Sequence, residues 1–394
     1  MIAPSWALAA ALTLAPLTVV LQNRTMAPVA LLGFAGVILL GWRQGWRSSA
    51  PPILAWPMLA LLGWAALSAV WAPDAGRALE GVLRLGATLA LALLAADALR
   101  HEPPSPLIPR AAALGLAVGI AAALFDDLTG NALRAGVRGL REWGVALSFG
   151  LKNAASIIAL MLPLAVFAPS LPRALRMGLA AAGGAVVLLL PGESAKLAVL
   201  AALGAGMAAG FAPRLTRRGL GVAAALVVLT LPWLLGAVLP RDASTLPGSA
   251  AHRLLIWDFT AERIAERPWL GWGMDASRAI PGGSGNPDPT RRAAFGLTSE
   301  ADARWFAGAQ LLPLHPHNLA LQVWLELGVV GAVLLALLLA VLARAARSRA
   351  ACGCFAAGLV IAMLSYGAWQ YWWVAGLLLV GVTLATRSEA PSGR

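Results

Sequence analysis

Long apolar stretches separated by short polar turns run along nearly the whole chain. An α-helix needs about 20 apolar residues to cross a membrane, and several stretches reach that length. The pattern predicts helices over residues 3–21, 26–42, 53–71, 79–99, 107–125, 151–168, 174–191, 196–212, 219–239, 319–343, 351–366 and 368–386. The last two share one apolar run broken near Gly367. We expect a tight hairpin there, because a single helix of that length would exceed the bilayer.

Composition agrees with a membrane protein. Of 394 residues, 59% are hydrophobic and 12% are charged, whereas soluble proteins carry about 25% charged residues. The mean hydropathy is +0.76, and a soluble chain would expose these surfaces and aggregate. The net charge of +12 would suggest nucleic acid in a soluble protein. Here the basic residues mostly cap apolar segments, so we expect membrane lipids and no nucleic acid as partners. The fold class predicted is an all-α polytopic membrane protein with about 12 transmembrane helices.

The distribution of Lys and Arg predicts the direction of insertion. With a cytoplasmic N-terminus, every inner loop carries at least two basic residues. The first stretch, Ile2 to Leu21, lacks the basic start and cleavage site of a signal peptide, so we interpret it as a span. This topology gives transmembrane helices over 1–239, a long periplasmic loop over 240–318, transmembrane helices over 319–386 and a cytoplasmic tail over 387–394. Within the loop, 253–267 shows helical periodicity, and we expect it along the membrane surface.

Most polar side chains at membrane depth gather near the predicted outer ends of the helices, with Asp97 as an exception. Such groups are costly in a bilayer, so they are candidates for function. We expect Glu80 and Arg84 to form an ion pair, because they are four residues apart on one helix. The one-sided distribution predicts a site open to the periplasm. The other polar residues near these outer ends are Lys152, Asn153, Glu193, Lys196, Glu326, His315, His317 and Asn318.

The segment from Leu314 to Gly331 is the most informative part of the chain. Asn318 is suited to be the N-cap of the following helix, which would place His317 just outside it. A neutral histidine there can accept a proton from a hydroxyl group. Taken alone, an interfacial histidine bonded to a backbone carbonyl is the simpler interpretation. Two of the chain's four histidines, His315 and His317, lie here, which favours a functional role.

Two motifs resemble the bacterial O-antigen ligase and polymerase superfamily. His317-Asn318, nine residues, Gly328, two residues and Gly331 is similar to the ligase signature. A second segment, 251–273, resembles the family's Arg…Trp…Pro-x-x-Gly-x-Gly stretch. Its matching residues are Arg253, Trp257, Pro268, Gly271 and Gly273. The resemblance covers roughly residues 180–345. The two motifs identify the superfamily better than they distinguish a ligase from a polymerase.

The resemblance implies a GT-C-like fold and glycan transfer on the periplasmic face of the bacterial inner membrane. The donor would be a glycan on undecaprenyl pyrophosphate, and the acceptor the lipid A–core. Another glycan or a protein would be the acceptor of a polymerase or a protein O-oligosaccharyltransferase, which are the alternatives. The reaction would invert configuration and need neither cofactor nor metal. A small-solute transporter would instead require polar groups or broken helices at the midplane, and the sequence shows few of these.

The resemblance also implies roles for residues. His317 would activate the acceptor hydroxyl, while Arg253 and Lys196 would stabilise the leaving pyrophosphate. The family usually has an arginine where this chain has Lys196, and a lysine is a point charge without the bidentate fork. Further candidates for binding substrate are Asn318, His315, Arg138 and Arg141.

Three other patterns have simpler expectations. The adjacent carboxylates Asp126 and Asp127 could hold a divalent ion, but neighbouring side chains at a helix end diverge, so we expect no metal site. Gly328 and Gly331 are expected to allow close helix packing. The aromatic residues predict an outer interfacial belt, formed by Trp369, Tyr371, Trp372 and Trp373.

Overall fold

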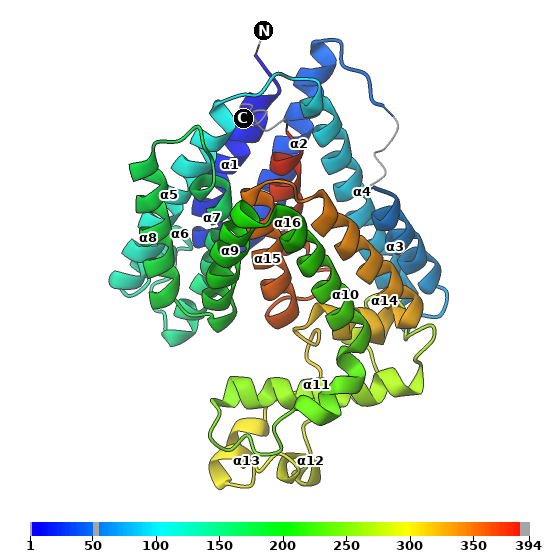
Figure 1. Cartoon of the computed structure of the whole chain (residues 1–394). Coiled ribbons are helices and arrows are strands. Elements are labelled where there is room, and N and C mark those ends of the chain that lie inside the picture. The colour runs from blue at the N-terminus through cyan, green and yellow to red at the C-terminus, as the bar shows by residue number, and fades with distance from the viewer. Residues whose placement is uncertain (1, 50–54, 387–394) are drawn as a thin grey trace.

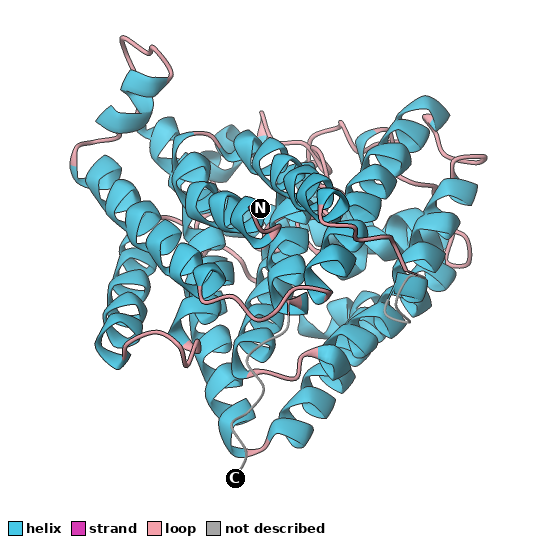
Figure 2. Cartoon of the chain, turned by 90° about the horizontal axis from the view of Figure 1, so that it is seen from above, coloured by secondary structure: helices cyan, strands magenta, loops and turns pink. Residues whose placement is uncertain are grey.

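The computed structural model describes residues 2–49 and 55–386, and within these ranges the chain consists of helices and loops without strands (Figure 2). The helices are α1 Ser5–Leu21, α2 Met26–Arg43, α3 Ala55–Ser68, α4 Ala75–Arg100, α5 Leu107–Leu128, α6 Ala132–Val137, α7 Leu151–Val166, α8 Arg173–Leu189, α9 Glu193–Phe211, α10 Pro213–Val238, α11 Gly248–Glu266, α12 Pro289–Ala293, α13 Glu300–Phe306, α14 Leu319–Ala345, α15 Arg349–Leu364 and α16 Tyr371–Ala385.

Each of the predicted apolar stretches is helical in the described residues, and α15 and α16 form the expected hairpin around Gly367. Seven helical segments are long and apolar enough to cross a membrane. The chain is therefore a polytopic membrane protein, while the count of about twelve spans remains a prediction. The predicted tail, 387–394, and the start of the predicted helix 53–71 lie outside the described residues.

The main bundle packs around α7, which is the most buried of the seven candidate spans. Its apolar side chains join those of α1, α2, α5, α9 and α16 in the largest hydrophobic core. A second core combines α3, α10 and α14 with part of α11. By contrast, α10 is the least buried candidate span, as expected for a helix whose apolar surface faces lipid.

Loops assigned to the same side of the membrane do lie together in space. At one end, the hydroxyl groups of Ser194 and Ser365 are hydrogen-bonded. At the other end, the backbone N–H of Ser5 donates to the Glu102 carboxylate at 3.0 Å. Helix α11 extends across the first end, with α12 and α13 beyond it, and the start of α1 lies at the opposite end (Figure 1). The two groups of loops therefore lie at opposite ends of the bundle.

Helix α14 is broken at Gly328, where φ is 62° and ψ is −162°. The carbonyls freed by the break accept hydrogen bonds from a strap, residues 268–273, that crosses the helix. The N–H of Trp272 donates to Leu325 at 2.8 Å, and that of Gly273 donates to Glu326 at 2.7 Å. In return, Val329 donates to Pro268 at 2.9 Å. The strap thus replaces the helical bonds that the break removes.

The glycine at this break has a different role from the expected one. A Cβ on Gly328 would lie 2.3 Å from the carbonyl oxygen of Trp269, and its dihedral angles are open essentially only to glycine. Gly271 of the strap has φ of 69°, and a Cβ there would lie 2.5 Å from the Glu326 backbone. The expectation of simple helix packing at Gly328 was therefore wrong.

The predicted aromatic belt was also wrong in part. Trp372 and Trp373 are buried in the core, where their rings lie 4.8 and 5.4 Å from that of Tyr366. The indole N–H of Trp369 donates to the Glu326 carboxylate at 2.5 Å. Trp372 and Trp373 therefore pack inside the protein instead of forming an interfacial belt.

Candidate active site

The turn that carries the His-Asn motif has a defined backbone. Asn318 is the N-cap of α14, as predicted, and its side chain accepts from the N–H of Leu321 at 3.0 Å. His317 adopts a left-handed conformation with φ of 56°, which histidine tolerates better than most residues. The indole N–H of Trp257 donates to the Pro316 carbonyl at 2.8 Å. The two motifs recognised in the sequence are thus in direct contact.

The hydrogen bonds of His317 fix its tautomer. Its Nδ1 lies 2.7 Å from the carbonyl oxygen of Ser365. Because a carbonyl only accepts, Nδ1 carries the proton and Nε2 keeps a lone pair. The backbone N–H of His317 donates to Nδ1 of His315 at 3.1 Å. The structure thus contains the bond to a backbone carbonyl that the simpler interpretation expected. The same bond leaves Nε2 free to accept a proton, so it is also compatible with a catalytic base.

Burial keeps both imidazoles neutral. The pKa of His317 is lowered to about 4, chiefly by burial. The Ser365 carbonyl opposes this shift, while the positive charges of Arg253 and Lys152 add to it. Burial and the neighbouring His317 lower the pKa of His315 to about 3. At neutral pH, the site therefore presents an uncharged base next to two fixed cations.

Those cations come from different helices. Arg253 lies on α11 and Lys152 on the first turn of α7, with its Nζ 5.6 Å from the centre of the Tyr366 ring. Both side chains are partly buried, and burial lowers the pKa of Arg253. Neither has a carboxylate partner among residues 2–49 and 55–386. Partly buried charges without a counter-charge are costly, and this arrangement favours binding of an anion.

Lys152 was expected among the polar groups near the outer ends of the helices, but no role toward substrate was predicted for it. One signal was available, because Lys152 and Lys196 are the only lysines in the chain. Both begin helices at the end where His317 lies. The tertiary structure distinguishes them, because α7 packs against the turn at Tyr366 and so brings Lys152, but not Lys196, close to His317.

The other predicted site residues have different surroundings. Lys196 forms an ion pair with Glu193 at 2.8 Å, two residues after the Ser194 that bonds to Ser365. Arg138 donates twice to the Leu21 carbonyl, at 3.1 and 2.9 Å. In the described part of the chain, no contact joins Lys196, Arg138 or the exposed Arg141 to His317. Their roles toward substrate stay predictions.

Glu326 connects the strap to the active-site turn. Its buried carboxylate accepts from the Ser277 hydroxyl at 2.5 Å and from the Gln322 amide at 3.0 Å. It also accepts from Trp369, and Gln322 in turn accepts from the N–H of Ala368 at 2.7 Å. The carboxylate therefore holds the 365–370 turn, which carries the His317 acceptor, against α14.

The carboxylate pair considered for metal has another explanation. Asp126 and Arg134 form an ion pair at 2.5 Å in which both side chains are fully buried. Arg134 also donates to the Leu147 carbonyl at 2.7 Å and bonds to Asn131. Asp126 therefore organises the loop before α7. Glu80 and Arg84 form the expected ion pair on α4.

A family model described as O-antigen ligase matches residues 145–336. This range contains Lys152, Arg253, the strap and His317. This part of the chain is therefore similar to the O-antigen ligase family.

Curated relatives in Rickettsia, each named "Putative polysaccharide ligase", agree with this assignment. The protein of Rickettsia conorii is 35% identical over 143 residues, which cover 34% of this chain and 31% of the relative. That of Rickettsia felis is 35% identical over 165 residues, covering 39% and 37%. That of Rickettsia prowazekii is 40% identical over 135 residues, covering 32% and 29%. The chain spans about a third of the length of the curated relatives it matches.

Proposed function

We propose that this chain is a ligase-type glycosyltransferase. It transfers a glycan from undecaprenyl pyrophosphate to a hydroxyl group of the lipid A–core on the periplasmic face of the inner membrane. The observation that carries the proposal is the neutral His317 placed beside Arg253 and Lys152. Both cations are partly buried and have no carboxylate partner among the described residues. A lipid pyrophosphate supplies the anion that this arrangement favours.

The chemistry follows from the fixed tautomer. Nε2 of His317 takes the proton of the acceptor hydroxyl as its oxygen attacks the anomeric carbon. The bond from that carbon to the pyrophosphate oxygen breaks, the electron pair leaves with the pyrophosphate, and the configuration inverts. Arg253 and Lys152 stabilise the charge that develops on the leaving group. The bound pyrophosphate also raises the pKa of His317, because it offsets the two cations.

The same residues would serve a polymerase or a protein O-oligosaccharyltransferase, whose acceptors differ. A transporter is less well supported, although α14 is broken. The break is occupied by the strap, and the indole N–H of Trp64 donates to the Leu327 carbonyl there at 2.9 Å. The freed backbone groups are therefore bonded to protein rather than available to a solute.

The test uses the full chain in liposomes with an undecaprenyl-pyrophosphate-linked glycan and O-chain-free lipopolysaccharide. His317→Asn removes the base while keeping a residue that tolerates the left-handed backbone. We expect transfer to fall by about 10²–10⁴-fold, with unchanged thermal stability. His101→Ala, at the other end of the bundle, is the matched control. Transfer by His317→Asn at the original rate would refute the proposal.

The same assay separates the alternatives by product. Glycan on the lipid A–core indicates a ligase, whereas a longer glycan on the lipid carrier indicates a polymerase. A reporter fused near residue 285 that is active only in the cytoplasm would overturn the periplasmic placement.

A further inference from the structure

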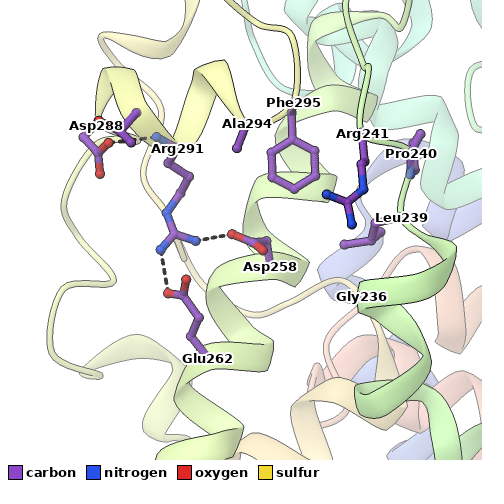
Figure 3. Close-up of a pocket in the computed structure, with 11 residues that line it drawn as sticks. Gly236, Leu239, Pro240, Arg241, Asp258, Glu262, Asp288, Arg291, Ala294 and Phe295 are labelled. Carbon is purple, nitrogen blue, oxygen red and sulfur yellow. Dashed lines mark hydrogen bonds and ion pairs between the residues drawn. The ribbon is translucent and has the colours of Figure 1, made fainter.

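A separate pocket of about 490 Å³ lies against α11 (Figure 3). It is bounded by the end of α10, residues 239–241, α11 and the segment 288–295 that contains α12. Pockets that hold small ligands have volumes of roughly 300–1,000 Å³. The pocket is therefore large enough for a small organic group, and nothing in the proposed transfer step uses it.

The polar groups of the pocket are both acidic and basic. Arg291 points between Asp258 and Glu262 and forms an ion pair with each (Figure 3). Arg291 is largely buried, with 17% of its side chain exposed. Asp288 accepts from the backbone N–H of Arg291 at 2.9 Å. In the described part of the chain, Arg241 has no hydrogen bond or ion pair, so its guanidinium is free to donate to a ligand.

Apolar groups complete the wall. The ring of Phe295 faces the pocket next to Ala294 and Leu239 (Figure 3). An aromatic face beside fixed carboxylate and guanidinium groups suits a ligand with C–H faces and several hydroxyl groups. Such a ligand donates its hydroxyl protons to carboxylate oxygens and accepts from guanidinium N–H groups. This is the chemistry of a saccharide.

Charge distinguishes this pocket from the His317 site. The pocket contains three carboxylates and two arginines, so a pyrophosphate would meet net repulsion. The His317 site has the opposite character, with Arg253 and Lys152 lacking carboxylate partners in the residues that the structure describes. The pyrophosphate leaving group therefore suits the His317 site, whereas a neutral sugar suits the pocket against α11.

Helix α11 connects the two places. Arg253 and Trp257 belong to the His317 site, the latter through its bond to Pro316. Asp258 follows Trp257 and is turned from it by about 100° around the helix, because an α-helix has 3.6 residues per turn. Asp258 and Glu262 are four residues apart and share a face. One rigid helix thus sets the position of the pocket relative to the base.

We propose that this pocket is a saccharide-binding subsite that holds a sugar of a glycan chain at a distance from the reacting end. Its place in the reaction rests on the proposed glycosyl transfer. The sugar belongs to either the donor glycan or the core acceptor, which share the same hydroxyl chemistry.

Direct binding to the full chain in detergent tests the subsite. The probes are delipidated O-chain fragments and delipidated core oligosaccharide from the bacterium that encodes the protein, both without pyrophosphate. Ala294→Trp fills the pocket from an exposed position that lines it, and Ala293→Trp places the same side chain one residue away, outside the lining. We expect one probe to bind, Ala294→Trp to weaken it at least tenfold and Ala293→Trp to leave it within twofold.

The outcome is separable from that of the proposed function. His317→Asn should reduce transfer by about 10²–10⁴-fold, while the binding of the saccharide probe stays within twofold. Binding of the O-chain assigns the subsite to the donor, and binding of the core assigns it to the acceptor. The inference is overturned if neither probe binds, if Ala294→Trp binds as tightly as the original chain, or if inorganic pyrophosphate competes for the pocket.

Discussion

Nδ1 of His317 lies 2.7 Å from the backbone carbonyl oxygen of Ser365. The two residues are 48 positions apart, on either side of α14 and α15. Ser365 is itself bonded through its hydroxyl to Ser194 at the start of α9. A turn between two late helices thus decides which nitrogen of the histidine can act as a base.

The pH profile of transfer should show an unusually acidic limb. The pKa of His317 is about 4, compared with an ordinary 6.5, and the neutral form is the active one. The rate is therefore lost as the pH falls through the pKa of the histidine. We expect kcat/KM, which reports on the free enzyme, to hold its value down to about pH 5 and to decline near pH 4. A limb at pH 6.5 would show that the histidine is solvated.

Lys152 and Lys196 provide a paired test of the cation that stabilises the leaving group. Lys152→Gln should reduce kcat by about 10²–10³-fold, as loss of one stabilising donor does in other sites. Lys152→Arg should recover part of that loss. Lys196→Gln should cost less, because Glu193 already neutralises Lys196. Initial rates at saturating donor give the comparison, and a larger loss for Lys196→Gln would favour the assignment made from the sequence.

Gly328→Ala should destabilise the protein. The added Cβ meets the Trp269 carbonyl at 2.3 Å, and the backbone there costs a residue other than glycine about 1–3 kcal/mol before any clash. We expect a clear fall in the melting temperature measured in detergent. Gly381→Ala is the control, because its Cβ meets no atom within 4 Å and helical alanine is preferred by about 0.5–1 kcal/mol. Equal melting temperatures for the two variants would show that α14 is not broken at Gly328.

Asp126→Asn should be more harmful than the same change at the next residue. It leaves the guanidinium of Arg134 buried without its counter-charge, at a cost of about 3–5 kcal/mol. Asp127 forms no hydrogen bond or ion pair through its side chain within the described ranges, and Asp127→Asn should be nearly neutral. Thermal unfolding monitored by tryptophan fluorescence distinguishes them. Similar losses of stability for both variants would show that the Asp126–Arg134 ion pair contributes little to folding.

Local patterns in the sequence were sufficient for the helices and for one end of the site. The apolar stretches predicted helices close to their observed bounds, and Asn318 predicted the start of α14. The expectation that His317 and Arg253 act in one site came from the resemblance to the ligase superfamily. The helices and the N-cap depend on hydropathy and capping, which are determined by residues within a few helical turns of one another.

Contacts between distant segments decided the rest. Lys152 reaches the site only because α7 packs beside the Tyr366 turn, and the tautomer of His317 depends on a carbonyl 48 residues away. The break at Gly328 exists because the strap supplies the hydrogen bonds that the helix gives up. The sequence by itself determined a helical membrane protein with a histidine at the mouth of one helix. Tertiary structure alone decided its partners, because side chains far apart in the chain meet only when whole helices pack.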